Sequence, residues 1–164
     1  MSRASRLATF TTKIDATIDR KAFATLRFAG DELDPREISA VLPVPPTRAH
    51  RKGEEFYAGE RAGHLRGRTG LWFLATDKLV PSNDLADHLR FIADLLRPAG
   101  DERVIDQLRE MLQRANARAH ITCFWHGDPG ETAPQIPDWL KSAAKRLTAD
   151  VETDFAAERR GRVG

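Results

Sequence analysis

Hydrophobic and polar positions along the chain alternate with two different periods, and these periods predict the elements. In the segments 22–29, 70–75, 119–126 and 150–155, residues at every second position form a set that would share one face of a β-strand. Apolar residues recur every three or four positions, as in amphipathic helices, in segments that begin near Asp34, Asp84, Asp101 and Asp138. The predicted order of elements is therefore β-α-β-α-α-β-α-β.

The first of these helices has the clearest boundaries. Asp34 suits the N-cap position and Pro35 the first helical position. Pro43 ends the helix, because the residue before a proline is disfavoured in the α conformation. The two middle helices are separated only by residues 98–100, and so short a connection predicts that they form an antiparallel pair.

This order predicts an α+β two-layer sandwich, in which a four-stranded mixed sheet carries helices mainly on one face. Each β-α-β crossover is expected to be right-handed and to lay its helix on the sheet. The second faces of the first three strands are partly apolar, so a three-layer arrangement remains an alternative. The segment 150–155 has one acidic face, which suits an edge strand. We expect a single domain over 22–156, an N-terminal arm at 1–21 and a basic C-terminal tail at 157–164.

The length of 164 residues suits one domain with a core that needs no disulfide or metal. Cys123 is the single cysteine, which excludes an internal disulfide and a multi-cysteine zinc site. No stretch approaches the roughly 20 apolar residues of a transmembrane helix, and the first residues lack the apolar core of a signal peptide. We therefore expect a cytoplasmic protein that does not contact membranes.

Positive charge gathers in one internal segment, although the whole chain carries a net charge of only +2. The basic residues of the segment 47–68 are Arg48, Arg51, Lys52, Arg61, Arg66 and Arg68, against Glu54, Glu55 and Glu60. The two chain ends are also basic, so the remaining body is acidic. Such an asymmetry can steer an anionic partner toward one region.

Residues 47–69 show no sustained period and are predicted to form a long loop after the rigid segment Val44-Pro45-Pro46. If this loop folds back, its guanidinium groups converge beside an aromatic ring, as in a clamp for phosphate, carboxylate or an unpaired base. The candidate ligand-binding residues are Thr47, Arg48, Arg51, Lys52, Arg66, Arg68 and Trp72. The alternative is that Trp72 belongs to the core and the arginines are solvated or paired with nearby glutamates.

The sequence offers little for catalysis. His120 and His126 lie about 20 Å apart along an extended strand, too far to chelate one ion without a bend. Cys123 is predicted to be a buried hydrophobic residue in the middle of a strand. No nucleophile elbow, phosphate-binding glycine loop or His-Glu-x-x-His pattern occurs. We expect no cofactor and no metal, and we favour a protein that is not an enzyme.

Part of this pattern resembles a known family. The residues that carry the resemblance are Leu26 and Gly30, Asp34-Pro35, Glu37-Ile38, Leu42, Pro46-Thr47-Arg48, Lys52-Gly53, Gly70 and Trp72. The chain is similar, over roughly residues 22–156, to the uncharacterised bacterial family of domains of unknown function number 4279. The resemblance implies a cytoplasmic bacterial domain, and it supplies no catalytic or binding residue.

Two functions from different classes follow from the sequence. The first is a non-enzymatic cytoplasmic interaction module, such as an accessory or immunity-like protein-binding domain, and the lack of a catalytic motif favours it. The alternative is the binding of an anion or a nucleic acid through the basic loop 47–68. The near-neutral net charge and the acidic body favour another protein as the partner.

Overall fold

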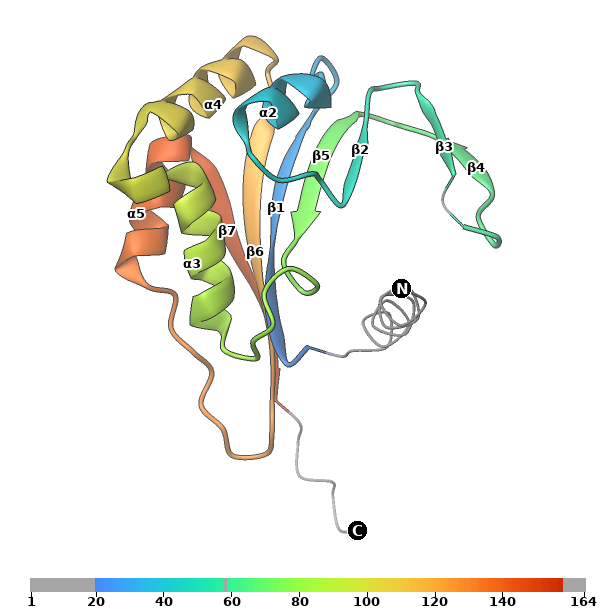
Figure 1. Cartoon of the computed structure of the whole chain (residues 1–164). Coiled ribbons are helices and arrows are strands. Elements are labelled where there is room, and N and C mark those ends of the chain that lie inside the picture. The colour runs from blue at the N-terminus through green and yellow to red at the C-terminus, as the bar shows by residue number, and fades with distance from the viewer. Residues whose placement is uncertain (1–19, 58, 158–164) are drawn as a thin grey trace, which may run out of the picture.

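The computed structural model describes residues 20–57 and 59–157. Its centre is a five-stranded sheet with the order β2-β5-β1-β6-β7 (Figure 1). These strands are β1 (Ala22–Gly30), β2 (Arg48–His50), β5 (Gly70–Ala75), β6 (Arg118–Gly127) and β7 (Ala149–Ala157). A separate two-stranded hairpin consists of β3 (Glu55–Tyr57) and β4 (His64–Arg66). The helices are α2 (Pro35–Val41), α3 (Leu85–Leu96), the 3-10 turn η1 (Pro98–Gly100), α4 (Arg103–Arg114) and α5 (Asp138–Leu147).

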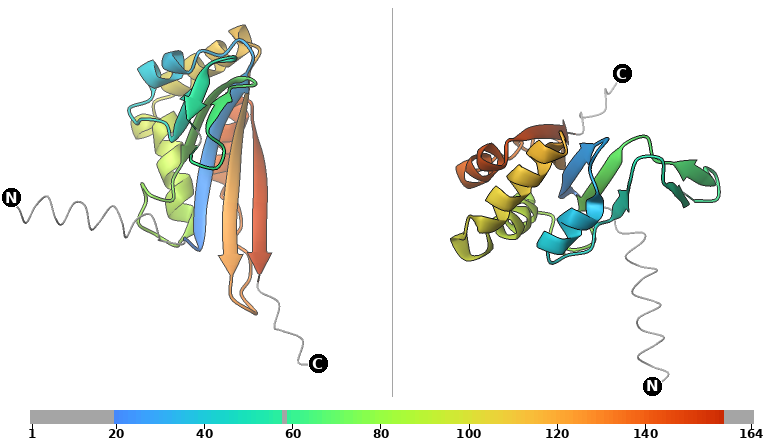
Figure 2. Two further views of the ribbon diagram at one scale, coloured as in Figure 1. Left: turned by 90° about the vertical axis from the view of Figure 1, so that its right-hand side faces the viewer. Right: turned by 90° about the horizontal axis from the view of Figure 1, so that it is seen from above.

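The helices all lie on one side of the five-stranded sheet, as Figure 2 shows. The side chains that alternate toward them are buried, among them Leu26 and Phe28 on β1, Trp72 on β5 and Ile121 on β6. From the helix layer, residues such as Leu89 complete the core. The prediction of an α+β fold with a mixed sheet and helices on one face is therefore confirmed. In the described part of the chain no helix covers the other face, where the β3-β4 hairpin packs on β2 through Phe56. The described residues therefore form two layers rather than the three of the alternative.

Local signals place the ends of the helices. The Asp34 carboxylate accepts a hydrogen bond from the Arg36 backbone N–H at 3.0 Å and caps α2 as predicted. The helix ends at Val41, two residues before Pro43. The Asp101 carboxylate accepts from the Arg103 backbone N–H at 2.9 Å, although Glu102 occupies the N-cap position of α4. Each carboxylate thus accepts a hydrogen bond from a backbone N–H of the first helical turn, which has no partner within the helix.

The sheet has one more strand than the sequence predicts. β2 adds to the edge of β5 through the pairs Arg48 with Phe73 and His50 with Leu71. The predicted long loop at 47–69 therefore contains β2, β3 and β4. Each of these strands has three residues, too few to show a period, so their pairing depends on the partner strand.

Strand directions also differ from the expected pair of β-α-β units. β1 runs antiparallel to β5, and Gly30 pairs with Gly70, so the chain leaves and re-enters the sheet at the same end. Only β6 and β7, which are joined through α5, form a parallel pair. β7 lies at the edge of the sheet, as its acidic face predicts.

The two middle helices do not form the expected antiparallel pair. η1 turns the chain, and α4 crosses above the end of α3 (Figure 1). α4 packs mainly on α5 and α2, whereas α3 packs on β1 and α5. Ala99 has a positive φ of 54° inside this turn, and that conformation redirects the chain.

Most of the predicted arm and tail lies outside the described residues. Of the arm at 1–21, the structure describes Arg20 and Lys21; of the tail at 157–164, it describes Ala157 as the end of β7. The division into arm, domain and tail stays a prediction.

Candidate functional site

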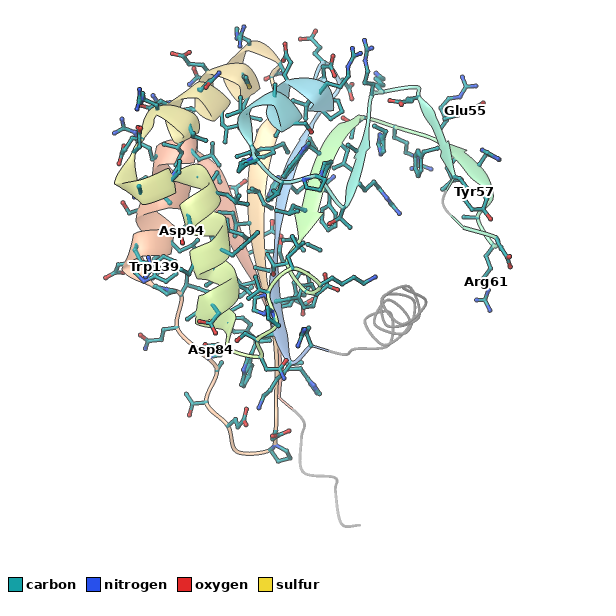
Figure 3. All side chains as sticks on the ribbon, viewed as in Figure 1. Glu55, Tyr57, Arg61, Asp84, Asp94 and Trp139 are labelled. Carbon is teal, nitrogen blue, oxygen red and sulfur yellow. The ribbon has the colours of Figure 1, made fainter. Side chains whose placement is uncertain are left out.

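The predicted basic cluster is divided among several elements. Arg48 lies on the edge strand β2, Arg51 and Lys52 lie in the turn that follows, and Arg66 ends β4. Lys52 forms an ion pair with Asp31 at 3.0 Å, and Arg66 forms one with Glu55 at 3.3 Å. Figure 3 shows Glu55, Tyr57 and Arg61 projecting from the hairpin, away from the sheet. The hairpin therefore pairs some of its cations with its own or nearby carboxylates.

An open hollow of about 520 Å³ lies between α2 and the turn after β2. Arg36, Arg51 and Lys52 line it together with Glu54 and His50, whereas Arg48, Arg66 and Arg68 are not among its lining residues. Arg36 forms an ion pair with Asp34 at 2.8 Å. The hydrogen bonds from Arg36 are also the main cause that lowers the pKa of Asp34. Carboxylates thus compensate most of the positive charge around this hollow.

Two of the predicted ligand-binding residues have structural roles. Trp72 is fully buried, and its indole Nε1–H donates to the Ser39 hydroxyl at 3.1 Å. Its ring is enclosed by the core, so it offers no face to a ligand, as the alternative interpretation held. The Thr47 hydroxyl accepts from the Ala75 backbone N–H at 2.9 Å and helps to join β2 to β5.

The hairpin is anchored to the sheet by stacked rings. The imidazole of His50 stacks on Phe56 with ring centroids 4.7 Å apart, and the Arg48 guanidinium lies 5.5 Å from the Phe56 centroid. His50 is only 7% exposed, and its Nδ1 atom has no hydrogen-bond partner in the described part of the chain. At Gly67 a Cβ atom would lie only 2.5 Å from Nδ1 of His50, so this close packing requires glycine.

Other reactive side chains form no site. Cys123 is buried as predicted, and burial raises the pKa of its thiol to about 12, so the reactive thiolate is scarce at neutral pH. Nδ1 of His120 lies 3.7 Å from the Asp150 carboxylate. The same nitrogen lies 3.6 Å from the Glu152 carboxylate. Within residues 20–57 and 59–157, no group of three or more His, Cys, Asp or Glu side chains is arranged so that it could hold a metal ion. In the same residues no helix has the length and apolar character that a membrane span needs.

The uncovered side of the sheet carries a different set of side chains, which we call the open face. Its residues point away from the helix layer, since successive strand residues point to opposite sides of a sheet. They are Arg48 and His50 on β2, Leu71, Phe73 and Ala75 on β5, Phe23, Thr25 and Arg27 on β1, His120, Thr122 and Phe124 on β6, and Asp150, Glu152 and Asp154 on β7. Two of them are buried, namely His50 beneath Phe56 of the hairpin, and Thr25.

One line of the open face crosses all five strands. The strand register places Arg48 beside Phe73, Phe73 beside Arg27, Arg27 beside His120, and His120 beside Asp150. Arg48 and Arg27 are exposed, and Phe73 between them is half-buried. The charge therefore changes from positive at β2 and β1 to negative at β7 along a single line.

The aromatic centre of the open face lies on β1 and β6. The rings of Phe23 and Phe124 stack with centroids 4.5 Å apart and planes 9° from parallel. Both side chains are only half-buried. They share an open hollow of about 450 Å³ with charged and polar residues, namely Arg20, Lys21, His126, Asp128 and Asp154.

The acidic border of the open face follows β7. Asp150 and Glu152 have side-chain exposures of 65% and 61%, and Asp154 is also exposed. The register sets them beside His120, Thr122 and Phe124 of β6. The open face thus has the basic Arg48 on β2, apolar residues on the inner strands together with Arg27 on β1, and an acidic border on β7.

The sequence contains a signal for this surface, namely apolar residues that also occur on the second face of three strands. Phe23 on β1, Leu71 and Phe73 on β5 and Phe124 on β6 give these strands apolar residues on both faces. This pattern left a three-layer arrangement open as an alternative to the predicted two layers, and in the described part of the chain no helix covers these residues.

In the residues that the structure describes, fold and surface together define a two-layer α+β protein whose mixed sheet carries helices on one face only. A family model described as a domain of unknown function, DUF4279, matches residues 20–156. The chain therefore belongs to the DUF4279 family, as the resemblance in its sequence indicated. No curated protein and no solved structure matches the chain.

Proposed function

We propose that this protein is a non-enzymatic interaction module that binds a protein partner through the open face. The aromatic side chains of the open face carry the proposal: Phe23, Phe73 and Phe124 are half-buried, and no described helix lies on this side of the sheet. Soluble proteins seldom expose contiguous apolar surface, and where they do it commonly marks a contact with another molecule. Aromatic residues are also enriched among the side chains that carry binding energy.

The charged borders of the open face support the same proposal. Arg48 lies on β2 and Arg27 on the central strand β1, next to Phe73, whereas the carboxylates lie together on the edge strand β7, namely Asp150, Glu152 and Asp154. An apolar centre with a charged rim is the usual anatomy of a protein interface. Opposite charges on the two sides orient a partner, since the reversed orientation would bring like charges together.

Binding of an anion or a nucleic acid through the basic segment is the second candidate. Arg48, Arg51 and Arg68 are exposed there and favour it, whereas the ion pairs of Lys52 and Arg66 reduce the available charge. This candidate predicts oligonucleotide binding that weakens steeply with salt, and a smaller salt dependence in the double variant Arg48→Ala, Arg68→Ala. Absence of salt-sensitive binding at low ionic strength would exclude it.

We place the module in the cytoplasm of a bacterium. The single cysteine is buried within the sheet, and the family resemblance points to bacteria. A reducing compartment suits a protein whose stability does not depend on disulfides.

A capture experiment with surface variants tests the proposed function. The full chain is immobilised and exposed to lysate of its native host, with wild type compared with Phe124→Asp, Arg27→Asp and the control Lys141→Asp. Lys141 is exposed on α5, on the helix side of the molecule. Wild type and the control should retain the same partner in a saturable way, and the two open-face variants should lose it.

Arg27 is exposed, so its substitution keeps the test valid if Phe124→Asp fails to fold. Circular dichroism establishes which variants are folded. Equal retention by all folded variants, or the absence of any saturable partner, would overturn the proposed function.

A further inference from the structure

We propose that the open face pairs with a second copy of the same chain, across a two-fold axis that runs parallel to the strands between β1 and β6. The proposal rests on the proposed function, because it assigns a partner to the same surface. It is carried by the way in which charge and aromatic residues are distributed across the strand register.

The charge distribution selects the direction of the axis. Two copies that meet through the same face are related by an axis in the plane of the contact. An axis perpendicular to the strands would lay β7 over β7 and bring the carboxylates of Asp150, Glu152 and Asp154 against one another. An axis parallel to the strands instead lays the acidic side of each copy over the basic side of the other. Only the second arrangement places opposite charges together.

The aromatic pair selects the position of the axis. With the axis between β1 and β6, β1 of one copy lies over β6 of the other. Phe23 then faces Phe124 of the other copy, and the two stacked pairs form one cluster of four rings. Thr25 and Thr122, which are neighbours in the register, face each other in the same way.

The same position of the axis also brings acidic residues of the second copy to the basic side of the open face. β7 of the second copy lies over β5, whose open-face residues Leu71, Phe73 and Ala75 carry no charge. Arg27 and Arg48 flank Phe73 in the register, one on each side. Asp150 of the other copy therefore lies next to the exposed Arg27 guanidinium, while the Arg48 guanidinium on the far side of Phe73 lies over the Phe56 ring of the hairpin. The two-fold axis repeats the contact between Arg27 and Asp150.

The size of the surface is sufficient for a dimer. Four overlapping strands about 4.8 Å apart span roughly 19 Å, and strands of about eight residues are roughly 27 Å long. Each copy then covers about 500 Å², or about 1,000 Å² for the pair, near the lower limit of specific interfaces. We therefore expect a dimer that forms and dissociates with concentration.

Pairing through the sheet edges is disfavoured by the same strands. β2 has only three residues, and β7 carries a row of exposed carboxylates. Short and charged edge strands are features that prevent two sheets from joining edge to edge. The open face is therefore the surface through which two copies meet.

Sedimentation velocity of the full chain over a range of concentrations tests the proposal. Wild type and the control Lys141→Asp should form a dimer, whereas Arg27→Asp and Asp150→Arg should each raise the dissociation constant by about tenfold or more, because like charges then face each other. An equimolar mixture of Arg27→Asp with Asp150→Arg should restore the dimer. In the mixed dimer, the two substituted positions meet as an acidic and a basic residue, and the second contact is the wild-type pair of Arg27 with Asp150. Both substituted residues are exposed, and circular dichroism verifies that the variants fold.

A wild-type chain that stays monomeric at all concentrations would overturn the second copy as partner. So would single variants that dimerise as wild type does, or a mixture that stays monomeric. Those results would leave the proposed function standing if the host lysate yields a different partner that the open-face variants lose. The two proposals can therefore fail separately.

Discussion

The hydroxyl of Thr76 lies 2.6 Å from Nδ1 of the fully buried His88, and this contact joins β1, the end of β5 and α3. The Thr76 hydroxyl oxygen also accepts a hydrogen bond from the Ala24 backbone N–H at 2.9 Å. On the other side of the imidazole, Nε2 of His88 donates to the Ser82 carbonyl oxygen at 2.7 Å. Both ring nitrogens thus have partners inside the protein, as buried polar groups require.

Replacing Thr76 by valine should destabilise the protein by about 1–3 kcal/mol. The substitution keeps the shape of the side chain but leaves the Ala24 N–H and Nδ1 of His88 without a partner in a buried position. Urea denaturation measures the change, with Thr132→Val at an exposed loop position as the control. An unchanged midpoint for Thr76→Val would show that the network contributes nothing to stability.

Leu89→Ala should reduce the free energy of unfolding by about 2–5 kcal/mol. Leu89 is fully buried on α3, and truncation removes apolar contacts and leaves a cavity. Leu79, with 45% of its surface exposed, provides the matched control Leu79→Ala, which should change stability little. Equal effects of the two substitutions in urea denaturation would contradict the position of α3 in the fold.

Gly67→Ala should loosen the hairpin while leaving the five-stranded sheet intact. An added Cβ would lie 2.5 Å from Nδ1 of His50 and 2.8 Å from the Arg51 carbonyl oxygen, so the hairpin base must shift. We expect faster amide hydrogen exchange in β3 and β4 and unchanged protection in β1 and β6. The control Arg68→Ala, at a neighbouring exposed position, should leave the hydrogen exchange of β3 and β4 as in wild type. If Gly67→Ala also left this exchange unchanged, the close contact between Gly67 and His50 would be contradicted.

Asp106 should make stability depend on pH in the acidic range. Its carboxylate accepts hydrogen bonds from Arg146, at 2.8 and 3.0 Å, and these lower the pKa of Asp106 from its ordinary value of 3.8. Because the folded-state pKa lies below the unfolded one, the stabilisation is present above pH 3.8 and is lost as pH falls through the folded value. Asp106→Asn should therefore be less stable than wild type at pH 6, with a difference that shrinks below pH 3.8.

Urea denaturation from pH 6 down to pH 3 measures this difference. Asp94→Asn, at an exposed position on α3, serves as the control and should follow the wild-type curve. A difference between Asp106→Asn and wild type that stays constant as the pH falls would exclude the Arg146 pairing as its origin.

Much of the central fold was predictable from the sequence, because its elements are long enough to show their own period. The stripe that contains Leu89 identified α3, and the alternation around Ile121 and Cys123 identified β6. The cap and the stop of α2 were visible as Asp34 and Pro43. In each case, local preference and burial agree.

The parts that the sequence did not predict depend on pairing between distant segments. β2 is only three residues long and becomes a strand because Arg48 and His50 meet the edge of β5. The apolar second face of the strands was visible, but Phe23 and Phe124 did not reveal whether a helix layer covers them. The open face also needs the register of five strands, which places Arg27 beside His120 and Asp150 beyond it.

The central claim is that the open face, rather than the basic hairpin, is the contact surface. Hydroxyl-radical footprinting of the wild-type chain tests this claim directly. The reference is the chain alone at low concentration, and it is compared with the chain bound to its captured partner or with the chain at high concentration. We predict that Phe73 and Phe124 lose reactivity, whereas Tyr57 on the hairpin, which is 59% exposed, keeps it. Protection of Tyr57 with unchanged reactivity of Phe73 and Phe124 would contradict the account.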